Sequence, residues 1–138
     1  MALNFLGIVS ALTAFLGIWL GHVAVRLIEA RSDDLRIPMF GTGLLGVGGI
    51  SLSLLMNSSY LTAICGILGV VFIWDTLELY RQENRVKQGH APANLDNPRH
   101  ARILADHPPA SVVDWLNRNP RGRAYTAEEI EIIAKGTK

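Results

Sequence analysis

Two long stretches without a charged residue limit what this chain can fold into. No Asp, Glu, Lys or Arg precedes Arg26, and none occurs in the 38 residues from Ile37 to Trp74. A soluble domain of 138 residues cannot hide such runs, because most residues of a small domain touch water. The two runs therefore predict an all-α membrane protein whose apolar segments are surrounded by lipid.

The lengths of the runs predict three membrane spans. A transmembrane helix needs about 20 apolar residues, so the 24 residues from Ala2 to Val25 form one span. The second run would extend about 57 Å as a single helix, nearly twice the thickness of the hydrocarbon core. Turn-favouring residues interrupt it at positions 57–60. We therefore expect a hairpin of two spans, near residues 37–56 and 61–79.

The basic residues predict the orientation of the spans. All 13 Lys and Arg lie either between the first two spans or after the third. Cytoplasmic segments carry such an excess of positive charge, which places the N-terminus outside and the C-terminus in the cytoplasm. We expect a transmembrane unit over residues 1–89, whose third helix continues past the membrane to Gly89 through a Glu83–Lys87 pair. Residues 90–138 then form a cytoplasmic tail.

The tail combines loop-forming residues with two short amphipathic segments. Residues 91–109 are interpreted mainly as loop. Ser111 can cap a helix near residues 111–118, and Thr126 opens a helix near residues 127–135 with a capping box. Isolated helices of this length are marginal, so their apolar residues should dock on a partner protein or on the membrane surface. These predicted docking residues are Val112, Trp115, Leu116, Ile130 and Ile133.

Small residues recur at helical spacing in the first and third spans. This predicted packing face consists of Thr13, Gly17, Gly21, Gly66 and Gly69. Small side chains at this spacing let helix backbones approach closely in a membrane. The pattern fits packing among the three spans of one chain, and it also fits association with a second copy or with another membrane subunit.

Several ionisable residues lie near the inner ends of the spans. They form a predicted polar cluster of His22, Arg26, Glu29, Asp75 and Glu78. Ionisable groups inside a membrane are costly and frequently functional, whereas groups near the interface reach water. The alternatives are a structural cluster that fixes helix ends, a proton or ion path, and haem ligation by His22 with a second ligand from elsewhere.

No pattern in the sequence predicts catalysis or metal binding. Residues 41–46 match the dinucleotide-binding spacing G-x-G-x-x-G, but they lie within an apolar span and lack the acidic residue that the motif requires. The tail histidines His90, His100 and His107 do not have the spacing of a zinc site. We expect no enzyme activity and no cofactor, with haem at His22 as the alternative.

The end of the third span carries a specific pattern. Residues 74–89 read Trp-Asp-Thr-Leu-Glu-Leu-Tyr-Arg-Gln-Glu-Asn-Arg-Val-Lys-Gln-Gly. Pro92 and Asn94 follow. Over residues 4–98 the chain resembles a family of small bacterial multi-pass membrane proteins of unknown function. It departs from that family at Val23, where the family has Pro, and in the tail from Arg99, which looks like an extension. The resemblance implies a bacterial inner-membrane location and no activity.

Taken together, these features predict a non-catalytic accessory subunit of a larger membrane complex, respiratory or photosynthetic. Its expected partners are other membrane protein subunits and the lipid bilayer. Nucleic acid is disfavoured because acidic residues are dispersed among the basic residues of the tail. The alternatives are a small redox carrier that binds haem through His22, and a small homo-oligomeric transporter or channel.

Overall fold

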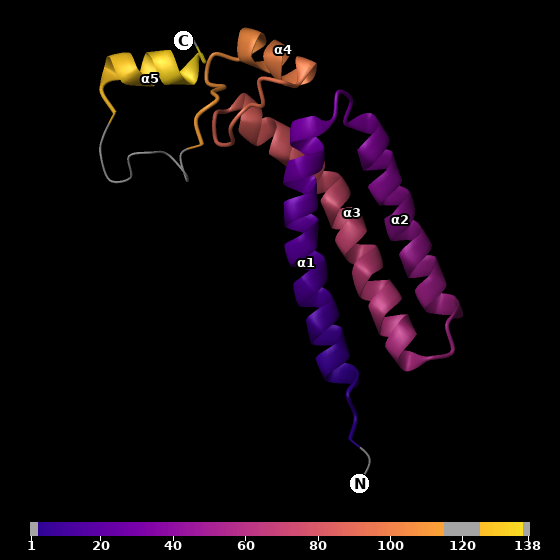
Figure 1. Ribbon diagram of the computed structural model, residues 1–138. Coiled ribbons are helices and arrows are strands. Elements are labelled where there is room, and N and C mark those ends of the chain that lie inside the picture. Colours follow the sequence, from indigo (N-terminus) through magenta and orange to yellow (C-terminus); the bar gives the residue numbers. More distant parts are fainter. Residues whose placement is uncertain (1–2, 115–124, 137–138) are drawn as a thin grey trace. The chain divides into compact units, whose positions relative to one another are not determined.

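The computed structural model describes residues 3–114 and 125–136, and these residues form five helices and no strand (Figure 1). The helices are α1 (Leu6–Arg31), α2 (Arg36–Leu55), α3 (Ser59–Lys87), α4 (Pro98–Asp106) and α5 (Ala127–Ala134). The prediction of an all-α architecture is confirmed for this part of the chain.

The first three helices are long and apolar enough to cross a membrane. This confirms the prediction of three candidate spans. Figure 1 shows α2 and α3 running antiparallel on either side of a short turn, which lies where the sequence predicts the hairpin. The charge-free run is therefore divided into two helices at the turn-favouring residues. Each crossing is helical because a helix satisfies its backbone hydrogen-bonding groups internally, which a non-helical crossing would not.

The described residues divide into two compact units. The first comprises Met1–Ile28 and Leu35–Leu79, and we call it the membrane unit. The second comprises Glu29–Asp34 and Tyr80–Lys138, and we call it the polar unit. The division that the sequence predicts, at Gly89, differs from this one. The last residues of α1 and the last turns of α3 contribute to the polar unit because the tail packs against them.

Glycines allow close packing within the membrane unit, where α3 contacts both other helices. A Cβ at Gly17 of α1 would lie 3.1 Å from the Leu68 side chain of α3. Between α2 and α3, a Cβ at Gly69 would lie 2.7 Å from the Ile50 backbone nitrogen, and one at Gly46 would lie 2.9 Å from the Gly69 carbonyl. Backbones this close leave no room for a side chain, so these glycines set the spacing of the helices.

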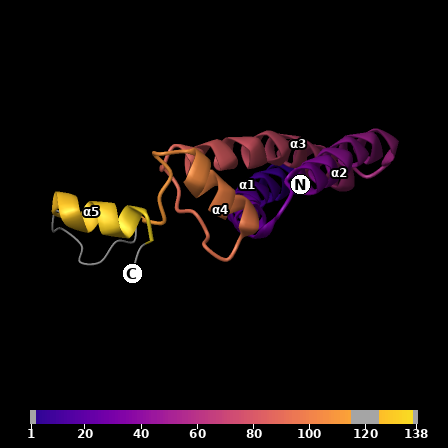
Figure 2. The ribbon, with the colours of Figure 1, turned by 90° about the horizontal axis from the view of Figure 1, so that it is seen from above.

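The polar unit has its own small apolar cluster. It consists of Val86, Ala91, Ala93, Ile103 and Ala110, with Leu104 and Val112 packed against it. Figure 2 gives the second view of α4, the helix that supplies Ile103 to this cluster. The cluster explains why a tail rich in Pro and Asn is folded: several small apolar side chains share one interior instead of facing water.

The end of α3 confirms the role predicted for Gly89. Gly89 has a φ of +73°, and its N–H donates to the Val86 carbonyl at 3.1 Å. The His90 N–H donates to the Arg85 carbonyl at 2.8 Å. These two bonds form a Schellman motif, which ends a helix with a residue in the left-handed region. The predicted Glu83–Lys87 ion pair is also present, at 3.1 Å.

The structure differs from the sequence interpretation in the tail. Residues predicted mainly as loop contain the helix α4, which begins where the Asn97 side chain accepts the Arg99 N–H at 2.8 Å and Pro98 occupies the first turn. An N-cap followed by proline is a strong start signal that the loop interpretation overlooked. The expected helix near residues 111–118 is not formed at residues 111–114, where the Ser111 carbonyl instead accepts the Ala93 N–H. Its remaining residues lie outside those described.

Candidate functional site

The strongest polar site in the described residues is built on the C-terminal end of α1, within the polar unit. The last carbonyls of a helix have no intrahelical partner. Asn94 donates its side-chain N–H to the Ala30 carbonyl at 2.9 Å. Asn97 donates to the same carbonyl at 3.0 Å and to the Ser32 carbonyl at 3.1 Å. Two tail residues therefore supply a C-cap that α1 lacks in its own sequence.

Arg99 joins three segments of the polar unit. Its Nη2 donates to the Glu29 carboxylate at 2.9 Å and also to the Glu29 backbone carbonyl. Its Nη1 donates to the Glu83 carboxylate at 3.0 Å, and its Nε donates to the Ser32 carbonyl at 3.0 Å. The guanidinium is well suited to this role because its donors form a rigid planar fork.

His100 completes the site from the next position of α4. It is fully buried, and its Nδ1 accepts the Asn94 backbone N–H at 2.8 Å. A ring nitrogen that accepts a hydrogen bond carries no proton, so the proton is on Nε2. Nε2 lies 2.9 Å from the Glu29 carboxylate and donates to it. His100 therefore supplies Glu29 with a second donor, and Arg99 Nη2 lies 2.9 Å from the same ring nitrogen.

The charges of this site balance. The carboxylates of Glu29 and Glu83 face the cations of Arg99 and Lys87, and Glu29 is only 1% exposed. Buried charges are tolerated when they are paired and hydrogen-bonded. The arrangement can therefore hold α1, α3 and α4 together within the polar unit, and its donors and acceptors are used for that purpose.

The structure separates the members of the predicted polar cluster. Asp75 and Glu78 are buried in the membrane unit, whereas Glu29 belongs to the polar unit and pairs with Arg99 and His100. The side chains of His22 and Arg26 are exposed on α1. Three of the five predicted residues are thus buried; Asp75 and Glu78 belong to the membrane unit and Glu29 belongs to the polar unit.

The predicted packing face lies largely within the membrane unit. Gly17 and Gly21 face α3, Gly69 faces α2, and Gly66 lies opposite Ser53 of α2. The Thr13 hydroxyl donates to the Val9 carbonyl of its own helix at 2.8 Å. Of the two interpretations of this pattern, packing among the three spans accounts for the four glycines.

The predicted docking residues of the tail have different surroundings. Val112 is partly buried against the apolar cluster of the polar unit, and Trp115 and Leu116 lie outside the described residues. Ile130 and Ile133 lie on α5, where Ile130 is 40% exposed and Ile133 is half-buried. Ile132, which the sequence analysis did not select, is 56% exposed.

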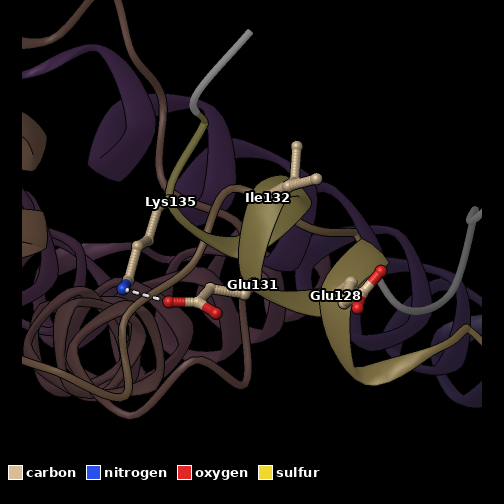
Figure 3. A pocket seen from close by; sticks show the side chains of 4 residues that line it. All are labelled: Glu128, Glu131, Ile132 and Lys135. Atoms are coloured by element: carbon tan, nitrogen blue, oxygen red, sulfur yellow. Dashed lines mark hydrogen bonds and ion pairs between the residues drawn. The ribbon is translucent and has the colours of Figure 1, made fainter.

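A shallow hollow lies beside α5. Its lining residues are Glu128, Glu131, Ile132 and Lys135 (Figure 3). Lys135 Nζ donates to the Glu131 carboxylate at 2.9 Å, and this bond together with the positive charge of Lys135 lowers the pKa of Glu131. The capping box predicted at the start of this helix is present, because the Thr126 hydroxyl accepts the Glu129 N–H at 3.2 Å.

No group of three or more His, Cys, Asp or Glu side chains in the described residues is placed to hold a metal ion. The residues that form the strongest polar site, Asn94, Asn97, Arg99 and His100, were not selected from the sequence. Only Asn97-Pro98 carries a local signal, as the start of a helix. The partners of Arg99 and His100 lie about seventy positions earlier in the chain, and no spacing rule connects residues so far apart.

Three helices that are long and apolar enough to cross a membrane, together with a polar unit, indicate a multi-span membrane protein. The chain belongs to the family described as a domain of unknown function (DUF4491), which matches residues 4–97. Glu29, Glu83, Asn94 and Asn97 lie within the matched region, whereas Arg99 and His100 follow it. Searches of curated proteins and of solved structures gave no significant match.

Proposed function

We propose that this protein is a non-catalytic accessory subunit of a bacterial inner-membrane complex, with its N-terminus outside and its C-terminus in the cytoplasm. The observation that carries the proposal is the polar unit. It is built directly on the ends of two candidate spans, and its buried ionic groups are used to fold it. A folded unit at the ends of membrane helices is suited to binding a second protein at the membrane surface.

The distribution of basic residues supports the orientation. Arg26, Arg31 and Arg36 lie between the first two spans, and the other ten Lys and Arg follow the third. Both positions fall on the same side of the membrane when there are three spans, and an excess of Lys and Arg is retained in the cytoplasm. The polar unit, which contains most of these residues, would then face the cytoplasm.

The chemistry of α5 favours a protein partner over the lipid surface. Within the eight residues of α5 there are three Glu and no Lys or Arg. Helices that lie on bilayers are usually rich in Lys and Arg, because the cytoplasmic leaflet is anionic. The exposed Ile130 and Ile132, next to Glu128 and Glu131, instead fit a partner surface that combines apolar and basic side chains.

Native gel electrophoresis after gentle solubilisation tests this proposal. We expect a tagged full-length chain to migrate in an assembly much larger than the monomer, and chemical cross-linking to identify a second membrane protein at the tail. The double variant Ile130→Ser, Ile132→Ser should release the chain as a monomer while it stays in the membrane. A matched control is Leu54→Ser, because Leu54 is 81% exposed on α2, outside the tail. Migration of the unmodified chain as a monomer would contradict the proposal.

A further inference from the structure

One buried carboxyl group has no part in the site described above. Asp75 lies on α3 within the membrane unit and is only 6% exposed. It directly follows the charge-free run that ends at Trp74. Within the described part of the chain its carboxyl group accepts no hydrogen bond, and its oxygens are not fully enclosed, since every fully buried side-chain oxygen and nitrogen there has a partner. Buried carboxylates normally accept several hydrogen bonds, so Asp75 needs another explanation.

The space that Asp75 occupies is made by a glycine of another helix. A Cβ at Gly21 of α1 would lie 2.8 Å from both carboxyl oxygens of Asp75. The carboxyl group therefore points at α1 and fills the room that Gly21 leaves. The next residue, Thr76, faces the other neighbour, because its hydroxyl lies 2.9 Å from the Thr42 hydroxyl of α2.

The ionisable neighbours of Asp75 come from two helices. His22 on α1 and Glu78 on α3 are ionisable side chains near its carboxyl group. On α2, residues 37–55 contain no ionisable side chain. Asp75 thus has one neighbour that favours its negative form when charged, His22, and one that opposes it, Glu78. Neither donates a hydrogen bond to its carboxyl group.

An ionised carboxylate is expensive in apolar surroundings unless it is paired and hydrogen-bonded, and the group usually takes up a proton instead. A sodium or magnesium ion would require several oxygen ligands, whereas the described residues offer no cluster of acidic or histidine side chains for a metal.

Asp75 lies six residues before Arg81, which corresponds to about 9 Å along a helix. Protons could therefore reach it from the inner surface.

From this geometry we propose that Asp75 is a proton-binding site in the third span: its carboxyl group is protonated at neutral pH and exchanges its proton with the aqueous phase on the side of Arg81. The ligand class is the proton alone. This site is independent of the docking role proposed above, because it lies in the membrane unit and involves none of the residues of α5. Ionisable residues within spans that take up and release protons are typical of proton-linked membrane proteins.

Labelling with dicyclohexylcarbodiimide tests the protonation state. This apolar reagent reacts with a protonated carboxyl group: the acid proton moves to a carbodiimide nitrogen while the carboxyl oxygen bonds to the central carbon. The adduct rearranges to a stable N-acylurea without losing an atom. With the full chain in liposomes at neutral pH, we expect peptide mass spectrometry to find the label on Asp75. Glu128, which is exposed to water on α5, should carry about tenfold less label than a carboxyl group in apolar surroundings.

Infrared spectroscopy of the same liposomes gives a readout that does not depend on reagent access. We expect the spectrum at neutral pH to contain the C=O band of a protonated carboxyl group. This band should shift in D2O, and it should be absent from the spectrum of the Asp75→Asn variant. Gly21→Ala should alter the band because its methyl group displaces the carboxyl, whereas Gly48→Ala, which has open space, should not. The absence of a protonated-carboxyl band that depends on Asp75 would overturn the proposal, as would labelling of Glu78 with Asp75 unmodified.

Discussion

Replacing Arg99 with methionine tests whether the polar unit is held together by its buried ion pairs. The substitution keeps much of the apolar stem but leaves Glu29, which is 1% exposed, with His100 as its remaining side-chain donor. Removing one partner of a buried ion pair costs about 3–5 kcal/mol, because the other charge stays buried and unpaired. Glu83 is more exposed and keeps its ion pair with Lys87. Loss of the Arg99–Glu83 ion pair therefore adds less than about 1 kcal/mol to the destabilisation.

Hydrogen exchange of the α4 amides measures this effect. With about 1.4 kcal/mol for each tenfold change, the Arg99→Met variant should raise the opening constant of α4 by about two to three and a half orders of magnitude. Arg102→Met is the matched control, because Arg102 lies on the same helix and is exposed. Its effect should stay within about 0.5 kcal/mol.

A double variant separates the ion pair from simple packing. Adding Glu29→Met to Arg99→Met removes the unpaired charge, so part of the lost protection should return. Equal losses in Arg99→Met and Arg102→Met would refute the reasoning. So would a double variant whose loss is the full sum of the two single losses, because the two side chains would then not be coupled.

Three further substitutions probe the packing. His100→Phe removes the acceptor of the Asn94 N–H and should lower α4 protection by about 1–3 kcal/mol, the cost of an unsatisfied buried donor; unchanged exchange would contradict the hydrogen bond. Gly46→Ala should overpack α2 on α3, destabilise the folded state by about 1–3 kcal/mol and lower the thermal midpoint in detergent, while Gly48→Ala should be neutral. A lower midpoint in Gly48→Ala than in Gly46→Ala would contradict this packing of α2 on α3. Gly89→Ala strains a residue with a φ of +73°, at about 1–2 kcal/mol, and meets the Pro109 carbonyl. Limited proteolysis after α3 should then be faster, and an unchanged rate would count against this turn.

Local patterns in the sequence were sufficient for several features whose residues are close in the chain. The absence of charge over two runs predicted three candidate spans, because the length and polarity of a segment determine whether it can replace water by lipid. Gly89 marked the end of α3, and Glu83 with Lys87 predicted an ion pair one helical turn apart. The start of α4 at Asn97-Pro98 was also present in the sequence but was hidden among other loop-forming residues.

Only the tertiary structure decided which of the polar residues meet. Glu29 appears in the sequence as one member of the predicted polar cluster, yet its partners are Arg99 and His100 of the tail. Likewise, Asp75 gains its place from Gly21 on another helix. Helical periodicity shows which side of one helix a residue occupies. Helical periodicity does not show which residue of a distant segment lies opposite that side. This depends on how the distant segment folds back onto the helix, which is determined by a turn, a helix start or a glycine elsewhere in the chain.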